Sequence, residues 1–128
     1  RTSFPEKDGI AVQMIAPEAD LPLPVLELAE AELPDVLRKL ARRPFDLADG
    51  PLIRASLLRL GGHDHMLVVV LHHIVCDGWS LGVMLRELAS LYAAFSQGGP
   101  SPLPPLSVQY ADFSEWQRGW LQAEILQS

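Results

Sequence analysis

The sequence predicts an α+β fold in which helices cover a small mixed sheet. Three observations lead to this prediction. Short runs of aliphatic and β-branched residues are followed by longer runs with helical periodicity. Two of the short runs flank Gly61-Gly62, a strong turn signal, and therefore predict a hairpin. The chain has 128 residues, 48% of them hydrophobic and 20% charged, which is the composition of one folded domain.

The first half of the chain predicts two strands and a helix. Residues 10–16 alternate as a strand whose even-numbered side chains share one face. Residues 25–28 form a short strand, placed at a sheet edge because prolines precede it and cannot donate to a ladder. Residues 34–43 form a helix that has proline in its first turn and one apolar side. Pro44 ends this helix.

The second half predicts a hairpin followed by two helices. Residues 52–60 and 66–73 are its strands, and the unbroken apolar run of the second predicts a central strand buried on both faces. Residues 79–97 form the clearest helix, with an apolar side. A proline-rich connector leads to a last helix over residues 109–127. The aromatic side chains of that helix are expected to be core: Tyr110, Phe113, Trp116 and Trp120.

Composition excludes several classes of function. The net charge of −6 offers no electrostatic support for nucleic-acid binding. The N-terminal residues contain no apolar run typical of a signal peptide, and the longest aliphatic run, 66–71, is far shorter than a membrane span. The single cysteine, Cys76, precludes an internal disulfide and is compatible with a reducing cytosol. We therefore expect a cytoplasmic protein that uses neither nucleic acid nor membrane.

The most informative stretch is His72-His73-Ile74-Val75-Cys76-Asp77-Gly78. It places two imidazoles where the predicted strand ends, just before a helix. A neutral imidazole suits general base work, because it titrates near physiological pH. Consecutive strand residues point to opposite faces, so the two histidines are expected to have different roles. His73 is the catalytic candidate, against the alternative of a hydrogen-bonded core histidine, and His72 packs or holds its neighbour's backbone.

The residues after the histidines are expected to be structural. Asp77 either caps the following helix or pairs with an arginine that locks the loop. Gly78 is expected to supply backbone freedom at the strand-to-helix turn. Cys76 could be an activated thiol, but a small packed side chain is the simpler interpretation.

A zinc site is the alternative use of the histidines. His63, His65, His72 and His73 lie within eleven positions, close to Cys76 and Asp77. The first two are placed at the hairpin tip, about 25 Å along the strand from the last two. Zinc ligands must converge on one point, so the expectation is that no metal binds.

The residues 72–80 resemble the HHxxxDG motif of condensation domains in nonribosomal peptide synthetases, which belong to the chloramphenicol-acetyltransferase-like acyltransferases. Residues 110–116 resemble the next motif of that family, Tyr-x-Asp-Phe-x-x-Trp. Residues 1–4 resemble the end of the preceding motif, and residues 43–47 and 50–54 also resemble family sequence. The likeness extends through the whole chain.

This resemblance implies a reaction and a set of site residues. The reaction is aminolysis, in which the amine of one carrier-bound aminoacyl thioester attacks the thioester of another aminoacyl or peptidyl group. His73 is the central residue, either as general base or by positioning the amine and stabilising the charge formed. Asp77 matches the family's structural aspartate, which pairs with an arginine; Arg1 is a poor candidate for that partner. Gly78 lies close to the passage of substrate.

The resemblance also implies partners and limits. Peptidyl carrier proteins, upstream and downstream, present both substrates on phosphopantetheine, and the chain itself binds no cofactor or metal. A complete condensation domain has two subdomains, so residues 1–128 are expected to be part of the N-terminal one, to be inactive alone, to lack the C-terminal subdomain and to self-associate through uncovered apolar surface. Two alternatives remain: a non-catalytic module that docks carriers, and an acyltransferase that uses a free alcohol or amine.

Overall fold

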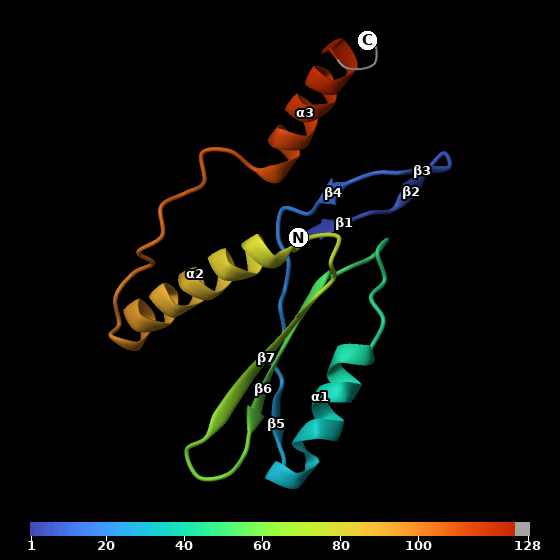
Figure 1. Ribbon diagram of the computed structural model, residues 1–128. Helices are drawn as coiled ribbons and strands as arrows, with labels where there is room; N and C mark the ends of the chain where they lie inside the picture. The colour runs from blue at the N-terminus through green and yellow to red at the C-terminus, as the bar shows by residue number, and fades with distance from the viewer. Residues whose placement is uncertain (125–128) are drawn as a thin grey trace. The chain divides into compact units, whose positions relative to one another are not determined.

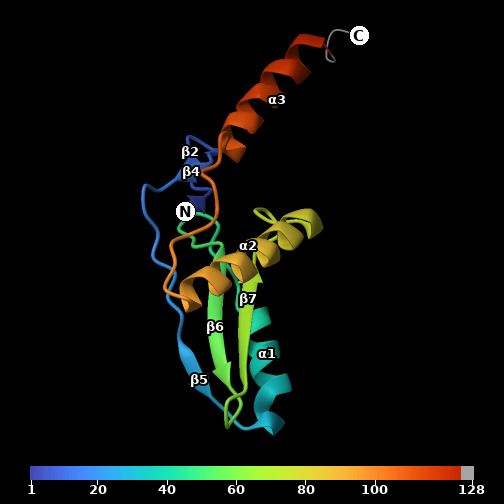
Figure 2. The same ribbon diagram turned by 90° about the vertical axis from the view of Figure 1, so that its left-hand side faces the viewer.

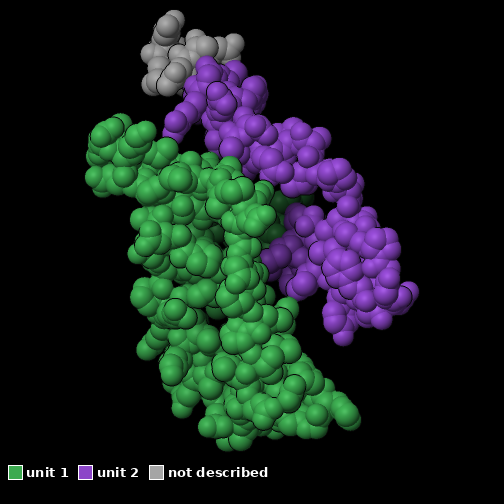
Figure 3. All heavy atoms as spheres, turned by 180° about the vertical axis from the view of Figure 1, so that it is seen from behind, with its two compact units in different colours: residues 1–81 green, residues 82–128 purple. Residues whose placement is uncertain are grey.

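The computed structural model describes residues 1–124 and has two compact units, residues 1–81 and 82–128 (Figure 3). Helices and short strands are both present, as the predicted α+β class requires. The first unit contains the sheet and the histidine motif, and the second contains most of one helix and a second helix. Among the described residues, no helix is long and apolar enough to cross a bilayer.

The first unit begins with a hairpin that the sequence prediction described only in part. Strands β1 (Thr2–Ser3) and β2 (Glu6–Lys7) pair antiparallel with β4 (Met14–Ile15) and β3 (Ile10–Ala11). The single strand predicted over residues 10–16 is therefore two short strands. The ladder is interrupted near Pro5, which has no N–H to donate.

A two-residue turn closes this hairpin. Asp8 and Gly9 both have positive φ, 55° and 79°, which is the conformation of a type I′ turn and matches the twist of the strands that it joins. Asp-Gly is a strong hairpin signal in a sequence, and it escaped the sequence prediction. The hairpin is joined to the rest of the unit by the Phe4 N–H, which donates to the carbonyl of Leu47 (2.6 Å).

The main sheet has the order β5-β6-β7 (Figure 1). Strand β5 (Val25–Glu27) is parallel to β6 (Ile53–Arg59), and β6 is antiparallel to β7 (His65–Leu71). The edge position predicted for residues 25–28 is confirmed. The central position predicted for residues 66–73 is wrong, because β6 is central and β7 lies at an edge of the described sheet. The unbroken apolar run predicted two neighbouring strands for β7, whereas the described sheet gives it one.

Helix α1 (Leu33–Arg42) packs on one face of this sheet (Figure 1 and Figure 2). It follows a short 3-10 turn, η1 (Glu30–Glu32), carries proline in its first turn, and ends before Pro44, as predicted. The covered face of the sheet holds alternate residues of β6 and β7, of which Leu58 is completely buried and Ser56 nearly so. Leu52, just before β6, is 3% exposed. These residues form the core of the first unit.

The helices that follow the motif are α2 (Gly78–Ser96) and α3 (Tyr110–Glu124). Helix α3 starts where the Gln109 N–H donates to the Asp112 carboxylate (2.8 Å), half of a capping box. Residues 125–127 of the predicted last helix lie outside the described residues. The aromatic side chains of α3 contact one another in sequence, and Trp116 and Trp120 are stacked with centroids 6.2 Å apart.

The predicted burial of these apolar helix faces is wrong for the chain as described. Tyr110 is 70% and Trp116 62% exposed, and on α2 Tyr92 and Phe95 are also exposed. Helical spacing identified the apolar side of each helix, but it carries no information about what covers that side. The exposed apolar side chains of α2 and α3 do match the other expectation, that this part of a larger domain leaves apolar surface uncovered.

Candidate active site

The loop between β7 and α2 carries the histidine motif. Strand β7 ends at Leu71, so both histidines follow its last paired residue, and the placement of the two rings on opposite strand faces stays a prediction. Their surroundings differ: His72 is half-buried, and His73 is exposed in a turn. The loop then passes through Cys76 and Asp77 into α2.

His72 is held by its backbone and by its ring. Its N–H donates to the carbonyl of Leu52 (3.0 Å), and its carbonyl accepts the N–H of Val75 (3.1 Å). Its Nδ1 accepts the N–H of Ile74 (3.1 Å), so a neutral His72 carries its proton on Nε2. The His72 and Phe45 rings form a T-shaped pair with a centroid distance of 5.8 Å and an interplanar angle of 87°. His72 therefore shapes the turn that presents His73.

His73 is the exposed member of the pair. Among the hydrogen bonds and ion pairs of the described residues, none uses its imidazole. Both ring nitrogens are thus free to meet a substrate, and the turn around them is closed by the two bonds that His72 accepts. An exposed imidazole on an ordered turn has the geometry that a general base or a substrate-positioning group needs.

Asp77 is the N-cap of α2. One carboxylate oxygen accepts the N–H of Ser80 (2.8 Å) and the hydroxyl of Ser80 (2.7 Å), and the Asp77 carbonyl accepts the N–H of Leu81 (3.0 Å). The hydrogen bond from the Ser80 hydroxyl, followed by that from its N–H, lowers the pKa of Asp77. Of the two roles left open by the sequence, capping is the one that the described residues show.

No cation among residues 1–124 forms an ion pair with Asp77. The guanidinium of Arg1 donates instead to the carbonyl of Pro17 (2.6 Å). The Cys76 thiol lies 3.5 Å from the Asp77 carbonyl and is half-buried. Gly78 begins α2 without a left-handed φ, and a Cβ there would meet nothing within 4 Å. The expected need for backbone freedom at Gly78 is therefore wrong.

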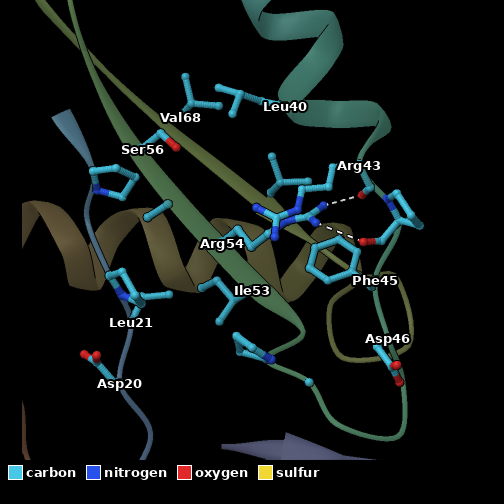
Figure 4. Close-up of a pocket in the computed structure, with 17 residues that line it drawn as sticks. Asp20, Leu21, Leu40, Arg43, Phe45, Asp46, Ile53, Arg54, Ser56 and Val68 are labelled. Carbon is cyan, nitrogen blue, oxygen red and sulfur yellow. Dashed lines mark hydrogen bonds between the residues drawn. The ribbon is translucent and has the colours of Figure 1, made fainter. Parts of the chain in front are cut away.

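Phe45 contacts the ring of His72, and Arg54 contacts Phe45; the sequence prediction assigned neither residue a role. The Arg54 guanidinium lies 3.8 Å from the centroid of the Phe45 ring and donates to the carbonyls of Arg43 and Pro44 (Figure 4). Burial, and to a smaller extent the charge of Arg43, lowers the pKa of Arg54. Residues 43–47 and 50–54, which contain Phe45 and Arg54, resemble family sequence. That resemblance indicated the family, but it did not indicate that the two side chains are in contact.

A pocket of about 510 Å³ lies beside this support. It is bounded by the segment containing Leu21, by the end of α1 at Leu40, and by the α1-facing side of β6 and β7 (Figure 4). Phe45 and Arg54 line it, whereas His72 and His73 do not. The exposed His73 ring therefore lies outside the pocket.

The sequence matches the Condensation domain family over residues 1–128. The chain belongs to the condensation domain family. This condensation-domain sequence is 47% identical to chondramide synthase cmdD of Chondromyces crocatus over 124 residues, which are 91% of this chain and 3% of that protein. It is 42% identical to malpinin synthetase of Mortierella alpina over 133 residues, which are 100% of this chain and 2% of that protein. The chain thus spans a few per cent of these relatives.

Solved structures agree with the family. The X-domain from teicoplanin biosynthesis superposes with a TM-score of 0.89 at 32% identity, covering 97% of this chain and 27% of that one. The starter condensation domain of rhizomide synthetase RzmA has a TM-score of 0.77 at 26% identity, covering 97% and 31%. The family resemblance and the α+β fold class are therefore confirmed for this condensation-domain chain.

Proposed function

We propose that this chain is part of the N-terminal subdomain of a condensation domain that forms amide bonds in nonribosomal peptide synthesis, with His73 at the centre of the reaction. The observation that carries the proposal is the exposed His73 imidazole. It sits on a turn that is held by His72 on one side and leads to the Asp77-capped start of α2 on the other. Family membership supplies the reaction class.

The proposed reaction has a simple balance. The amine nitrogen of the acceptor attacks the thioester carbonyl of the donor, a C–N bond forms, and the C–S bond breaks. The nitrogen loses a proton, and the departing thiolate gains one. His73 can contribute to this reaction as a general base that takes the proton from the amine, or as a group that orients the amine and stabilises the charge formed during attack.

The substrates and partners belong to the same proposal. Both substrates arrive as thioesters on the phosphopantetheine of carrier proteins, upstream and downstream, and residues 1–128 hold no cofactor of their own. Gly78 lies where substrate passes, and the open space around its Cα is compatible with that role. Asp77 meets an arginine from beyond this chain. The intact synthetase acts in the cytoplasm, and residues 1–128 alone are inactive and self-associate through their exposed apolar faces.

Replacement of His73 in the intact parent synthetase tests the role of this residue. With carrier-bound donor and acceptor, His73→Ala lowers the rate of amide formation by about 10²- to 10⁴-fold, the usual effect of removing a proton-transfer or charge-stabilising group. The matched control is His63→Ala, which removes an exposed histidine from the β6–β7 turn. Product is measured by mass spectrometry after single turnover. Equal rates in wild type and His73→Ala would remove His73 from the mechanism.

A non-catalytic docking role is the second candidate. A structural neighbour of this chain, the teicoplanin X-domain, has been solved in a complex with OxyB, so a domain of this fold can bind another protein. The same variant separates the two functions: loss of product with retained carrier binding supports catalysis. Unchanged turnover in His73→Ala, together with carrier binding that surface variants weaken, supports docking.

Use of a free small acceptor is the third candidate. SgcC5 from Streptomyces globisporus, solved with (R)-(-)-1-(2-naphthyl)-1,2-ethanediol and sucrose, has a TM-score of 0.75 at 30% identity. A parent of this kind would acylate a free alcohol or amine in the absence of a downstream carrier. Supplying the acceptor free and then carrier-bound, with the same donor, distinguishes this activity from carrier-to-carrier transfer.

A further inference from the structure

We propose that Arg54 and Phe45 are positioning residues for the histidine loop. Arg54 orients the Phe45 ring, Phe45 orients the ring of His72, and His72 sets the turn that presents His73. This inference rests on the proposed function of His73. Arg54 and Phe45 act through His72, and neither is proposed to touch substrate.

The first step is the attachment of Arg54 to the segment that carries Phe45. Its two terminal nitrogens donate to consecutive carbonyls, those of Arg43 and Pro44 (3.0 Å for Pro44), and its Cζ lies 3.8 Å from the Phe45 centroid (Figure 4). A planar guanidinium can donate two N–H bonds in its own plane while its flat face lies on a ring, whereas an ammonium has neither the flat face nor the fixed pair of donors. Arg54 itself is anchored in β6, in the centre of the sheet.

The second step is the contact between Phe45 and His72. The rings meet edge to face, with centroids 5.8 Å apart and planes at 87°. This is a favoured geometry for aromatic pairs, and it restricts rotation of the His72 ring. That restriction matters because His72 has one ring nitrogen that must face the Ile74 N–H.

The third step links His72 to the turn around His73. The Ile74 N–H donates to Nδ1 of His72, and the Val75 N–H donates to its carbonyl, so both closing bonds of the turn end on His72. In the sequence, His73 lies between His72, which accepts both bonds, and Ile74 and Val75, which donate them. A rotated His72 ring would release the Ile74 N–H and widen the set of positions that the His73 imidazole can adopt. Misplacement of a catalytic group by about 1 Å can cost roughly 100-fold in rate.

A matched set of variants in the intact parent synthetase tests this chain of contacts. Phe45→Leu removes the ring, and Phe45→Tyr keeps it. Arg54→Lys keeps the charge and loses the two-pronged donor. Arg59→Lys is the control, because Arg59 lies on the same strand but forms an exposed ion pair with Glu27 (2.6 Å), and such pairs contribute little.

Two measurements are made on each variant. Hydrogen–deuterium exchange reports the opening of the loop, through peptides that contain the amides of Ile74 and Val75, and of the sheet, through peptides from β6 and β7. Steady-state kinetics with carrier-bound substrates reports kcat and KM separately. We expect Phe45→Leu and Arg54→Lys to raise loop exchange by about five- to tenfold, as loss of one aromatic contact would. We also expect them to lower kcat about tenfold with KM unchanged, while Phe45→Tyr and Arg59→Lys match wild type.

Each outcome decides the inference. Unchanged loop exchange in Phe45→Leu overturns it, as does exchange that rises equally in the loop and in β6–β7, which would indicate general unfolding. If His73→Ala is inactive, faster loop exchange with unchanged kcat in Phe45→Leu or Arg54→Lys overturns the link between these residues and catalysis. If His73→Ala is as active as wild type, the proposed function has failed, and faster loop exchange alone still supports the positioning of the loop.

Discussion

Replacement of His72 separates the two ring contacts that order the loop before α2. His72→Phe keeps an aromatic ring against Phe45 and removes the acceptor for the Ile74 N–H. His72→Asn keeps an acceptor near the position of Nδ1 and removes the ring. His72→Ala removes both. All three leave the His72 carbonyl in place as the acceptor for Val75.

The expected magnitudes follow from these contacts. A hydrogen bond of this kind contributes about 1 kcal/mol, and Ile74 is an exposed residue, so the loss is not aggravated by burial. An edge-to-face aromatic pair also contributes about 1 kcal/mol. Each of the Phe and Asn variants should therefore raise the opening constant of the loop about fivefold, and His72→Ala, which loses about 2 kcal/mol, should raise it about 30-fold.

Hydrogen–deuterium exchange of peptides that span residues 72–77, measured in the intact synthetase, provides the test. Turnover should fall in the same order as exchange rises, but less far than in His73→Ala, because the exposed imidazole is retained. Equal exchange in His72→Ala and wild type would refute the reasoning. So would His72→Phe and His72→Asn variants that each reproduce the full effect of alanine, since the two contacts would then not be separate.

Three further predictions concern the supporting structure. Asp77→Ala should speed exchange of the Ser80 amide, and Asp77→Asn should preserve most of the cap. Because the pKa of Asp77 is lowered in the folded state, the contribution of its charge is complete above the ordinary aspartate pKa and is lost as pH falls through the lowered value. Asp77→Asn should therefore converge with wild type in acid, whereas Asp77→Ala, which has no side-chain acceptor, should keep faster exchange. Gly9→Ala forces a β-carbon into φ 79° and should weaken the first hairpin by about 1 kcal/mol, seen as faster exchange of its amides. Leu58→Ala should lower the free energy of urea unfolding by about 2–5 kcal/mol, monitored at peptides from β6 and β7, whereas Glu87→Ala, at an exposed polar position of α2, should change it by less than about 0.5 kcal/mol.

Local signals in the sequence located most elements well. The ends of α1 followed from Pro34 and Pro44, and the β6–β7 hairpin followed from Gly61-Gly62, because these residues restrict the backbone wherever they occur. The failures share a cause. The sheet position of β7 and the exposure of Trp116 depend on which segments lie alongside, and periodicity identifies only which side of an element is apolar.

The histidine motif shows the same division. Its residue types and spacing identified His73 as the catalytic candidate and left two structural roles open for Asp77. The folded chain distinguished those roles through a distance, from the Asp77 carboxylate to the Ser80 N–H, that spacing does not contain. It also added a reason for separating the histidines, since both follow β7 and differ through the contacts that His72 makes.

Residue identity along the chain was sufficient to predict an α+β domain, the condensation family and a reactive loop at residues 72–78, because backbone restriction and motif spacing are local properties. Folding was needed to bring Phe45 to His72 and Arg54 to Phe45, across 27 and 9 positions of sequence, since contacts between distant segments depend on sheet register and helix packing. The sequence predicted the loop, and the folded structure identified the residues that contact it.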